Sequence, residues 1–230
     1  MTTRSASLGL LTNVDGSSQF EWQDTKVVCS VTGPVEPKAR QELATRLALE
    51  VIVRPARGVP NTREKLIEDR LRAVLTPLIV CEKYPRQLCQ ITCQILEAGE
   101  DESEFSVKEL SCCVNASFLA LLDAQVALRS FCASVPLAIL RDCNELVVVP
   151  SAQQLQVSLS THSVALELVA GAKTVQSVLL LDSNGDFTED DLFRVLQLAE
   201  QNCLELAQFL RKTVAEKITN EVVRTEVVES

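Results

Sequence analysis

The chain has 230 residues, of which 47% are hydrophobic and 23% charged, and its net charge is −9. This composition excludes a disordered, collagen-like or low-complexity protein, because such sequences lack the apolar residues that form a core. An acidic protein does not bind duplex DNA over its whole surface, so any nucleic-acid contact must come from a local basic patch. No apolar run approaches the ~20 residues of a membrane span, and the N-terminus lacks the apolar stretch of a secretory signal. We therefore expect a protein that is not secreted and does not associate with membranes.

Turn residues, β-branched runs and helix caps predict the elements in chain order. The first half is expected to contain strands at 8–11, 18–22, 26–32 and 47–53, a helix from Asn61 to Pro77, a strand at 87–97 and a helix from Ser106 to about Leu128. The second half is expected to contain strands at 135–140, 146–149, 156–160, 164–169 and 175–181, and a last helix whose apolar stripe runs to Leu210.

Three helix starts carry a capping pattern. Asn61 with Glu64 and Ser106 with Glu109 have the spacing of capping boxes, and Thr188 caps the last helix ahead of three acidic residues. The order of elements predicts an α+β fold in which helices pack on the faces of mixed sheets. We expect a single domain over residues 1–230, with frayed ends at 1–7 and about 219–230.

Nine cysteines and one histidine are the side chains that most often carry catalysis or bind metal. The cysteines lie mostly in apolar segments and form no Cys-x-x-Cys pair, so we expect reduced core thiols rather than disulfides or a zinc site. His162 lies within a predicted strand, which favours a structural or solvent-facing histidine over a general base. The run from Asp182 to Asp186 resembles a calcium loop, but Phe187 stands where the loop requires glycine. We expect that run to be a turn before a helix, and we expect no cofactor and no metal.

Charge is distributed unevenly along the chain. From Lys38 to Arg72 there are nine basic residues and five acidic ones, whereas Lys108 is the only basic residue between Glu97 and Glu109. Guanidinium groups hold phosphate oxygens well, so the first segment can meet an anionic polymer that the second would repel. The alternative is an ordinary solvated loop with surface ion pairs, and composition alone favours this alternative.

Four runs resemble the RNase PH family in order and spacing, over about Leu8 to Leu210. They are VDGSSQFEWQDTKVVCSVTGPVEPKARQE, EDRLRAVLTPLI, CQITCQILEAGE and NASFLALLDA. The stretch SVTGPVEPKAR in particular is similar to the eukaryotic, fungal members that build the six-member ring of the RNA exosome core. The resemblance implies the βαβ fold of RNase PH and of domain 2 of ribosomal protein S5. It also implies a ring with a central channel for single-stranded RNA.

Active members of that family phosphorolyse RNA from its 3′ end. They hold the phosphate with a GGTR-type loop before the second helix and carry aspartates on the strand pair after it. The matching stretches here are GEDESEFSVKELSCC and LVVVPSAQQL. In them, acids replace the glycines and arginine (Glu100, Asp101, Glu102 and Glu104), and residues that bind no Mg²⁺ replace the aspartates (Val147, Val148, Val149 and Gln153).

The resemblance therefore implies a non-catalytic ring subunit that has lost the phosphate-binding arginine and the catalytic aspartates. It would support RNA degradation and rRNA processing in the nucleus, nucleolus and cytoplasm. Implied partners are other RNase PH-like subunits in a hetero-oligomeric ring, cap subunits with RNA-binding domains, a hydrolytic 3′-exoribonuclease and single-stranded RNA. One alternative is an active phosphate-dependent 3′-exoribonuclease that works as a homo-oligomer. Another is a free-standing interaction protein that reuses the fold.

The family also implies which residues contact RNA. In ring-forming relatives the strand-to-helix loop that matches residues 54 to 63 faces the channel mouth. On this basis Arg57 and Arg63 are the first RNA-binding candidates, followed by Arg70 and Arg72. Such contacts to phosphate are independent of sequence and sensitive to salt.

Overall fold

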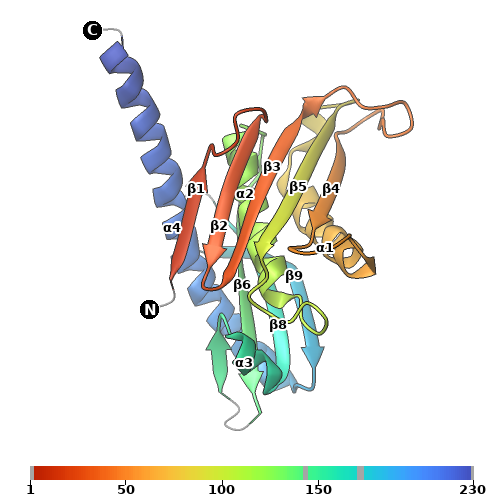
Figure 1. The fold of residues 1–230 in the computed structure, drawn as a ribbon, viewed down its shortest axis with the longest axis vertical. Coiled ribbons are helices and arrows are strands. Elements are labelled where there is room, and N and C mark those ends of the chain that lie inside the picture. Colours follow the sequence, from red (N-terminus) through yellow and green to blue (C-terminus); the bar gives the residue numbers. More distant parts are fainter. Residues whose placement is uncertain (1–2, 142–144, 170–173, 229–230) are drawn as a thin grey trace.

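Two sheets share one buried helix in this computed structural model, which describes residues 3–141, 145–169 and 174–228 (Figure 1). The first sheet has the order β1-β2-β3-β5-β4 and contains β1 (Arg4–Leu8), β2 (Gly16–Trp22), β3 (Thr25–Val35), β5 (Leu88–Glu97) and β4 (Ala48–Arg54). The second has the order β7-β6-β8-β9 and contains β7 (Leu146–Val148), β6 (Phe131–Leu140), β8 (Ser158–Leu168) and β9 (Val175–Gly185). All neighbouring strands are antiparallel except β4 and β5, which are parallel.

The helices connect and cover the sheets. They are α1 (Thr62–Leu78), α2 (Val107–Asp123), α3 (Ala152–Gln156) and α4 (Glu189–Val228), with a short 3₁₀ turn at Cys81–Lys83. α1 is the crossover between β4 and β5. α2 packs against both sheets, and all its residues from Val107 to Leu121 are buried. α4 packs against β6, β8 and β1, and its C-terminal part extends away from the body in Figure 1. This arrangement confirms the α+β fold with helices packed on mixed sheets.

The close contact between the first sheet and α2 depends on a glycine. A Cβ atom at Gly16 would collide with the backbone of Ala120 and Ala124 near the end of α2. Beside it, the backbone N–H of Ser17 donates to the Asp123 carboxylate over 2.9 Å. Only glycine lets β2 approach the helix this closely.

The core confirms the predicted role of the cysteines. The eight cysteines within the described residues are free and buried, while Cys143 lies outside them. His162 is also fully buried, and its two ring nitrogens hydrogen-bond the hydroxyl groups of Ser160 and Ser183 over 2.9 and 2.8 Å. Burial lowers the pKa of His162. It is therefore a satisfied structural histidine rather than a solvent-facing one.

Several predicted boundaries were wrong. The strand predicted at 8–11 is β1, which ends at Leu8 because the chain turns at Gly9, where φ is +70°. The two strands predicted at 156–160 and 164–169 are one strand, β8, preceded by the unpredicted helix α3. Asp182 to Gly185 are not a turn but the end of β9, because they pair with β8. The second helix ends at Asp123 rather than near Leu128.

The helices also bear on membrane association. Among the helices of the described residues, none is long and apolar enough to cross a membrane.

Candidate functional site

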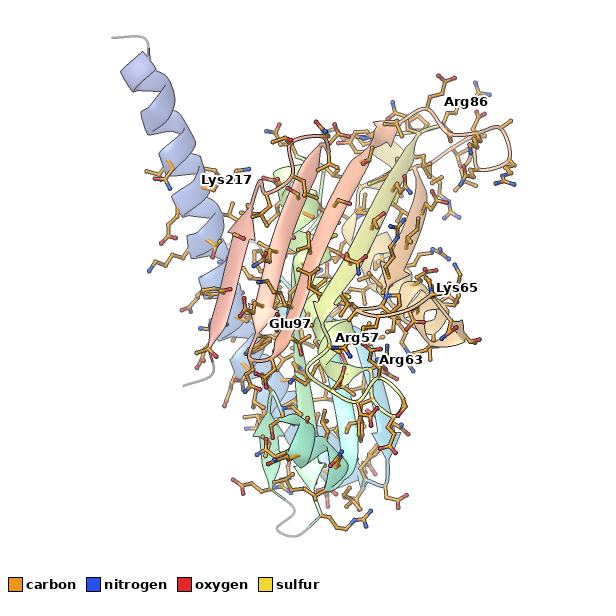
Figure 2. All side chains as sticks on the ribbon, viewed as in Figure 1. Arg57, Arg63, Lys65, Arg86, Glu97 and Lys217 are labelled. Carbon is orange, nitrogen blue, oxygen red and sulfur yellow. The ribbon has the colours of Figure 1, made fainter. Side chains whose placement is uncertain are left out.

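The loop between β4 and α1 holds the first RNA-binding candidate. Gln94 of β5 donates to the carbonyl oxygen of Pro55 over 3.1 Å, and the Asn61 N–H donates to the Glu64 carboxylate over 2.6 Å. These bonds fix the two ends of the loop and confirm the Asn61–Glu64 cap. Between them Arg57 is exposed (Figure 2), and its guanidinium makes no ion pair within the part of the chain that the structure describes. Arg57 is therefore available to an external phosphate.

Arg63, the second candidate, is already engaged inside the protein. Its guanidinium lies 2.6 Å from the Glu109 carboxylate and 3.2 Å from that of Glu64, and it donates to the carbonyl oxygen of Phe105 over 2.6 Å. Its side chain is only 22% exposed. Arg63 thus ties the start of α1 to the start of α2, although Figure 2 shows it on the same side of the molecule as Arg57.

The other two candidates point to different places. Arg70 pairs with Asp182 at the end of β9 over 2.5 Å. Arg72, two residues further along α1, pairs with Asp69 over 3.2 Å and lines a separate cleft at the other end of the helix. Residues two apart on a helix do not share a face. The structure therefore brings Arg57 and Arg63 to one region and does not assemble all four arginines into one stripe.

The acidic loop before α2 closes the N-terminus of that helix. The Glu100 carboxylate accepts the backbone N–H groups of Lys108 and Glu109 over 3.2 and 2.9 Å. Ser106 makes no capping bond with its side chain, so the predicted Ser106–Glu109 capping box is wrong. The reason is that Glu100 supplies the acceptor, while Glu109 binds Arg63 instead of folding back on Ser106. A helix N-terminus attracts anions, and here an internal carboxylate occupies that position.

Charged groups are unusually buried around this helix start. Lys108 is 1% exposed and donates to the carbonyl oxygen of Gly99 over 2.9 Å. Burial raises the pKa of Glu109 to about 8, and the Arg63 guanidinium opposes that rise. Burial also raises the pKa of Glu100, against the lowering effect of its two backbone hydrogen bonds. The Glu109 Oε1 atom is buried without a hydrogen-bond partner.

This burial makes stability depend on pH. The pKa of Glu109 is about 8 in the folded protein against an ordinary value of 4.5, so the folded state holds an extra proton between these pH values. Its contribution to stability is therefore present near pH 4.5 and is lost as the pH rises toward 8. We expect Glu109→Gln to flatten the fall of the unfolding free energy across this interval, measured by urea denaturation at several pH values. Glu97→Gln, at an exposed position on β5, is the control, and equal slopes in wild type and Glu109→Gln would contradict the assignment.

A second hollow, of about 280 Å³, lies between the acidic loop and the ends of β8 and β9. Arg70, Asp182, Glu104 and Thr161 are among its lining residues. Its arginine is already neutralised by Asp182, and Glu104 adds a further negative charge. Sequence reasoning missed this hollow and the role of Glu100, because no local pattern pairs α1 with β9 or the acidic loop with α2.

The stretch LVVVPSAQQL covers β7 and most of α3, and it combines apolar with uncharged polar residues. Val147 and Val148 lie in β7, Val149 is 2% exposed, and Gln153 lies in α3. The segment offers no carboxylate to a metal ion.

Comparisons with known proteins identify the family. The family model described as "3′ exoribonuclease family, domain 1" matches residues 3–127, and the model described as "3′ exoribonuclease family, domain 2" matches residues 133–202. The chain is 64% identical to the exosome complex component RRP46 of Saccharomyces cerevisiae, over 95% of this chain and 98% of that protein. It is 29% identical to the exosome complex component rrp46 of Schizosaccharomyces pombe, over 91% and 88%.

A solved structure agrees with these matches at the level of the fold. The crystal structure of rice (Oryza sativa) Rrp46 superposes with a TM-score of 0.80 at 20% identity, over 92% of this chain and 94% of that one. The two matched domains cover most of the chain, and the yeast relative aligns almost from end to end. The chain belongs to the RNase PH family of 3′ exoribonuclease folds.

Proposed function

We propose that this chain is a structural, non-catalytic subunit of the core ring of an RNA exosome. In that ring it supports 3′-to-5′ RNA processing and decay by helping to thread single-stranded RNA to a separate nuclease. The observation that carries the proposal is the 64% identity, over nearly the whole of both chains, to a yeast protein named as an exosome complex component. We extend that protein's assembly to this chain because the alignment leaves no large part of either chain unmatched.

The proposal also holds that this chain does not catalyse phosphorolysis. Family resemblance puts a phosphate-binding loop just before α2, where Glu100 here accepts the N–H groups of Lys108 and Glu109. A phosphate ion would have to displace this carboxylate and approach further acids in the same loop, at a cost in electrostatic repulsion. The stretch that matches the family's aspartates consists only of uncharged residues. Both observations support loss of the phosphate-binding and catalytic groups.

The surface of the second sheet supports assembly with other chains. β9 is an edge strand of eleven residues, and it leaves Val178 and Leu181 49% and 38% exposed. Phe187 and Phe193, which follow it, are also exposed. A long apolar edge is a template for pairing with another chain, and soluble proteins usually cover it. We propose that related RNase PH-like subunits cover such surfaces in a hetero-oligomeric six-member ring.

RNA guidance rests on the loop between β4 and α1. Arg57 is the candidate with a guanidinium exposed and unpaired among the described residues. Arg63, Arg70 and Arg72 remain proposed RNA contacts, but each must share its guanidinium with a carboxylate of this chain. We further propose cap subunits and a hydrolytic 3′-exoribonuclease as partners, and location in the nucleus, nucleolus and cytoplasm. We also propose that residues 1–230 form one folding unit, because a single buried cluster includes residues of both sheets.

The function is tested by the composition and activity of the complex captured on a tagged copy from its own cells. We expect an assembly that contains other RNase PH-like chains, and we expect this chain alone to release no nucleoside diphosphates from poly(A) in the presence of phosphate. A homo-oligomer that releases nucleoside diphosphates would overturn the proposal in favour of the active phosphorolytic enzyme. A lone monomer in cells would favour the free-standing interaction protein.

Arg57→Glu tests RNA guidance. Loss of one charge-assisted phosphate contact is expected to lower the yield of ultraviolet crosslinking to oligoadenylate by about fivefold in the captured complex. The remaining crosslinking should also depend less steeply on salt, because one phosphate contact fewer releases fewer counterions. Lys212→Glu is the matched control, since it makes the same charge change at an exposed position on α4. Equal losses in both variants would show a general effect of net charge and refute the role of Arg57.

A further inference from the structure

A cleft of about 430 Å³ lies at the end of α1 that is opposite to Arg57 and Arg63. Arg46, Arg72 and Arg129 lie on its rim, and we call it the arginine-rimmed cleft. Its floor is aliphatic, since the buried side chains of Leu47 and Ile79 line it. The volume falls within the range of ligand pockets, about 300 to 1,000 Å³.

The walls of the cleft are fixed before any ligand binds. The Leu47 N–H donates to the carbonyl oxygen of Cys81 over 2.9 Å, which joins the loop before β4 to the 3₁₀ turn. The Arg129 N–H donates to the carbonyl oxygen of Leu78 over 2.8 Å, which joins the segment after α2 to the end of α1. A ligand would therefore meet a preformed surface, which lowers the entropic cost of binding.

The charges of the rim are incompletely matched by the protein itself. Arg46 makes no ion pair within the described residues, and the Nε atom of Arg72 is buried without a hydrogen-bond acceptor. Arg72 and Arg129 pair with Asp69 and Glu82 over 3.2 and 2.7 Å, but all four side chains are at least 44% exposed. Exposed pairs of this kind contribute little and exchange partners readily. Glu82 is the one acid among the described lining residues, and Asp69 stands just outside the lining, so two carboxylates oppose three guanidinium groups in a protein of net charge −9.

We infer that the arginine-rimmed cleft is a docking site for a short acidic peptide segment with apolar side chains, supplied by a partner protein. The peptide's carboxylates would take the hydrogen bonds of Arg46, Arg72 and Arg129, and its apolar side chains would cover Leu47 and Ile79. Single-stranded nucleic acid fits less well, because it stacks its bases on aromatic side chains and the described lining residues include none. This inference goes beyond the proposed RNA guidance and does not depend on it, and it assigns Arg72 to the peptide rather than to RNA.

Binding of synthetic peptides to the full chain tests the inference. The probe is a fluorescent, blocked peptide that alternates glutamate and leucine, followed by anisotropy at low and raised salt. We expect saturable, salt-sensitive binding, weakened about tenfold in a chain that carries both Arg46→Ala and Arg129→Ala. Arg86→Ala is the matched control, because Arg86 is an exposed, ion-paired arginine outside the cleft lining, and its effect should stay below about twofold.

Other probes separate the alternatives. A peptide that alternates glutamate and serine keeps the charge but lacks the apolar side chains, and it should bind more weakly than the glutamate–leucine peptide. Equal binding of the two peptides, loss of binding in Arg86→Ala to the same extent, or no saturable binding would each overturn the inference. A different outcome is that oligoadenylate displaces the glutamate–leucine peptide from the wild-type chain and fails to bind the chain with both Arg46→Ala and Arg129→Ala. That result would reassign the cleft to RNA.

A second measurement uses the assembled complex. A photoreactive benzoylphenylalanine in place of Leu43, which is exposed at the cleft, should crosslink to a segment rich in acidic and apolar residues. The crosslinked peptide is identified by mass spectrometry after digestion. A basic or purely polar segment, or no crosslinked segment, would contradict the proposed occupant.

Discussion

Replacing Phe118 by alanine is expected to lower the free energy of unfolding by about 4 kcal/mol. Phe118 lies in the middle of α2 and is 1% exposed. The centre of its ring lies 4.5 Å from the centre of the Phe131 ring in β6. Truncation therefore leaves a cavity between α2 and the second sheet, and it removes an edge-to-face ring contact. Urea denaturation measures the loss. If residues 1–230 form one folding unit, the curve should remain a single transition that moves to lower urea.

Phe193→Ala is the matched control for this experiment. Phe193 lies on α4 and is 59% exposed, so the same truncation should cost less than about 1 kcal/mol. Two separate transitions, of which only one moves in Phe118→Ala, would show that the halves unfold independently. A loss no larger than that of Phe193→Ala would contradict the packing described for α2.

Arg63→Ala is expected to destabilise the protein by about 2 to 3 kcal/mol above pH 8, where the Glu109 carboxyl is ionised. Breaking a buried ion pair usually costs about 3 to 5 kcal/mol, and the value should be lower here because the Arg63 side chain is 22% exposed. The loss arises because Glu109, which is fully buried, keeps its carboxyl without a partner. Without the guanidinium the pKa of Glu109 should rise further. Denaturation of Arg63→Ala should therefore show a steeper dependence on pH above neutrality than wild type.

Lys65→Ala separates this structural role from loss of any basic side chain on α1. Lys65 also pairs with a buried carboxylate, that of Glu68, over 2.5 Å, but its own side chain is 71% exposed. Because an exposed partner contributes little, we expect a cost below about 1 kcal/mol. If Arg63→Ala and Lys65→Ala were equally mild and Arg63→Ala alone abolished RNA crosslinking, Arg63 would act as a direct RNA contact rather than as a brace between α1 and α2.

Sequence patterns predicted the elements correctly where neighbouring residues alone determine the structure. The strand predicted at 87–97 matches β5, in which Cys89, Ile91, Cys93 and Ile95 are buried, and Asn61 correctly marked the start of α1. β8 was split in two because the run around His162 is polar, yet cross-strand hydroxyl groups satisfy the buried imidazole. A strand that is polar and buried cannot be recognised from periodicity alone.

The candidate site shows the same division. Composition and family resemblance pointed to the arginines, but their partners come from distant segments, such as Glu109 for Arg63 and Asp182 for Arg70. The sequence therefore predicts which residues carry charge and not which charges are already used. The start of α2 illustrates this, because a tertiary contact from Glu100 replaced the cap that the local Ser106 pattern predicted.

The Glu100 carboxylate has a consequence for soluble anions. It stands eight residues before Lys108 in the chain, so it behaves as a ligand on a short tether. Tethering gives such a group an effective concentration in the millimolar range or above, and in the folded structure its carboxylate accepts both N–H groups. A free anion competing for the same two N–H groups must overcome that local concentration as well as the negative charge of its rival. The anion-binding position at the start of α2 is thus occupied by a carboxylate of the chain itself, and removal of this one carboxylate is the first change that any anion site there would require.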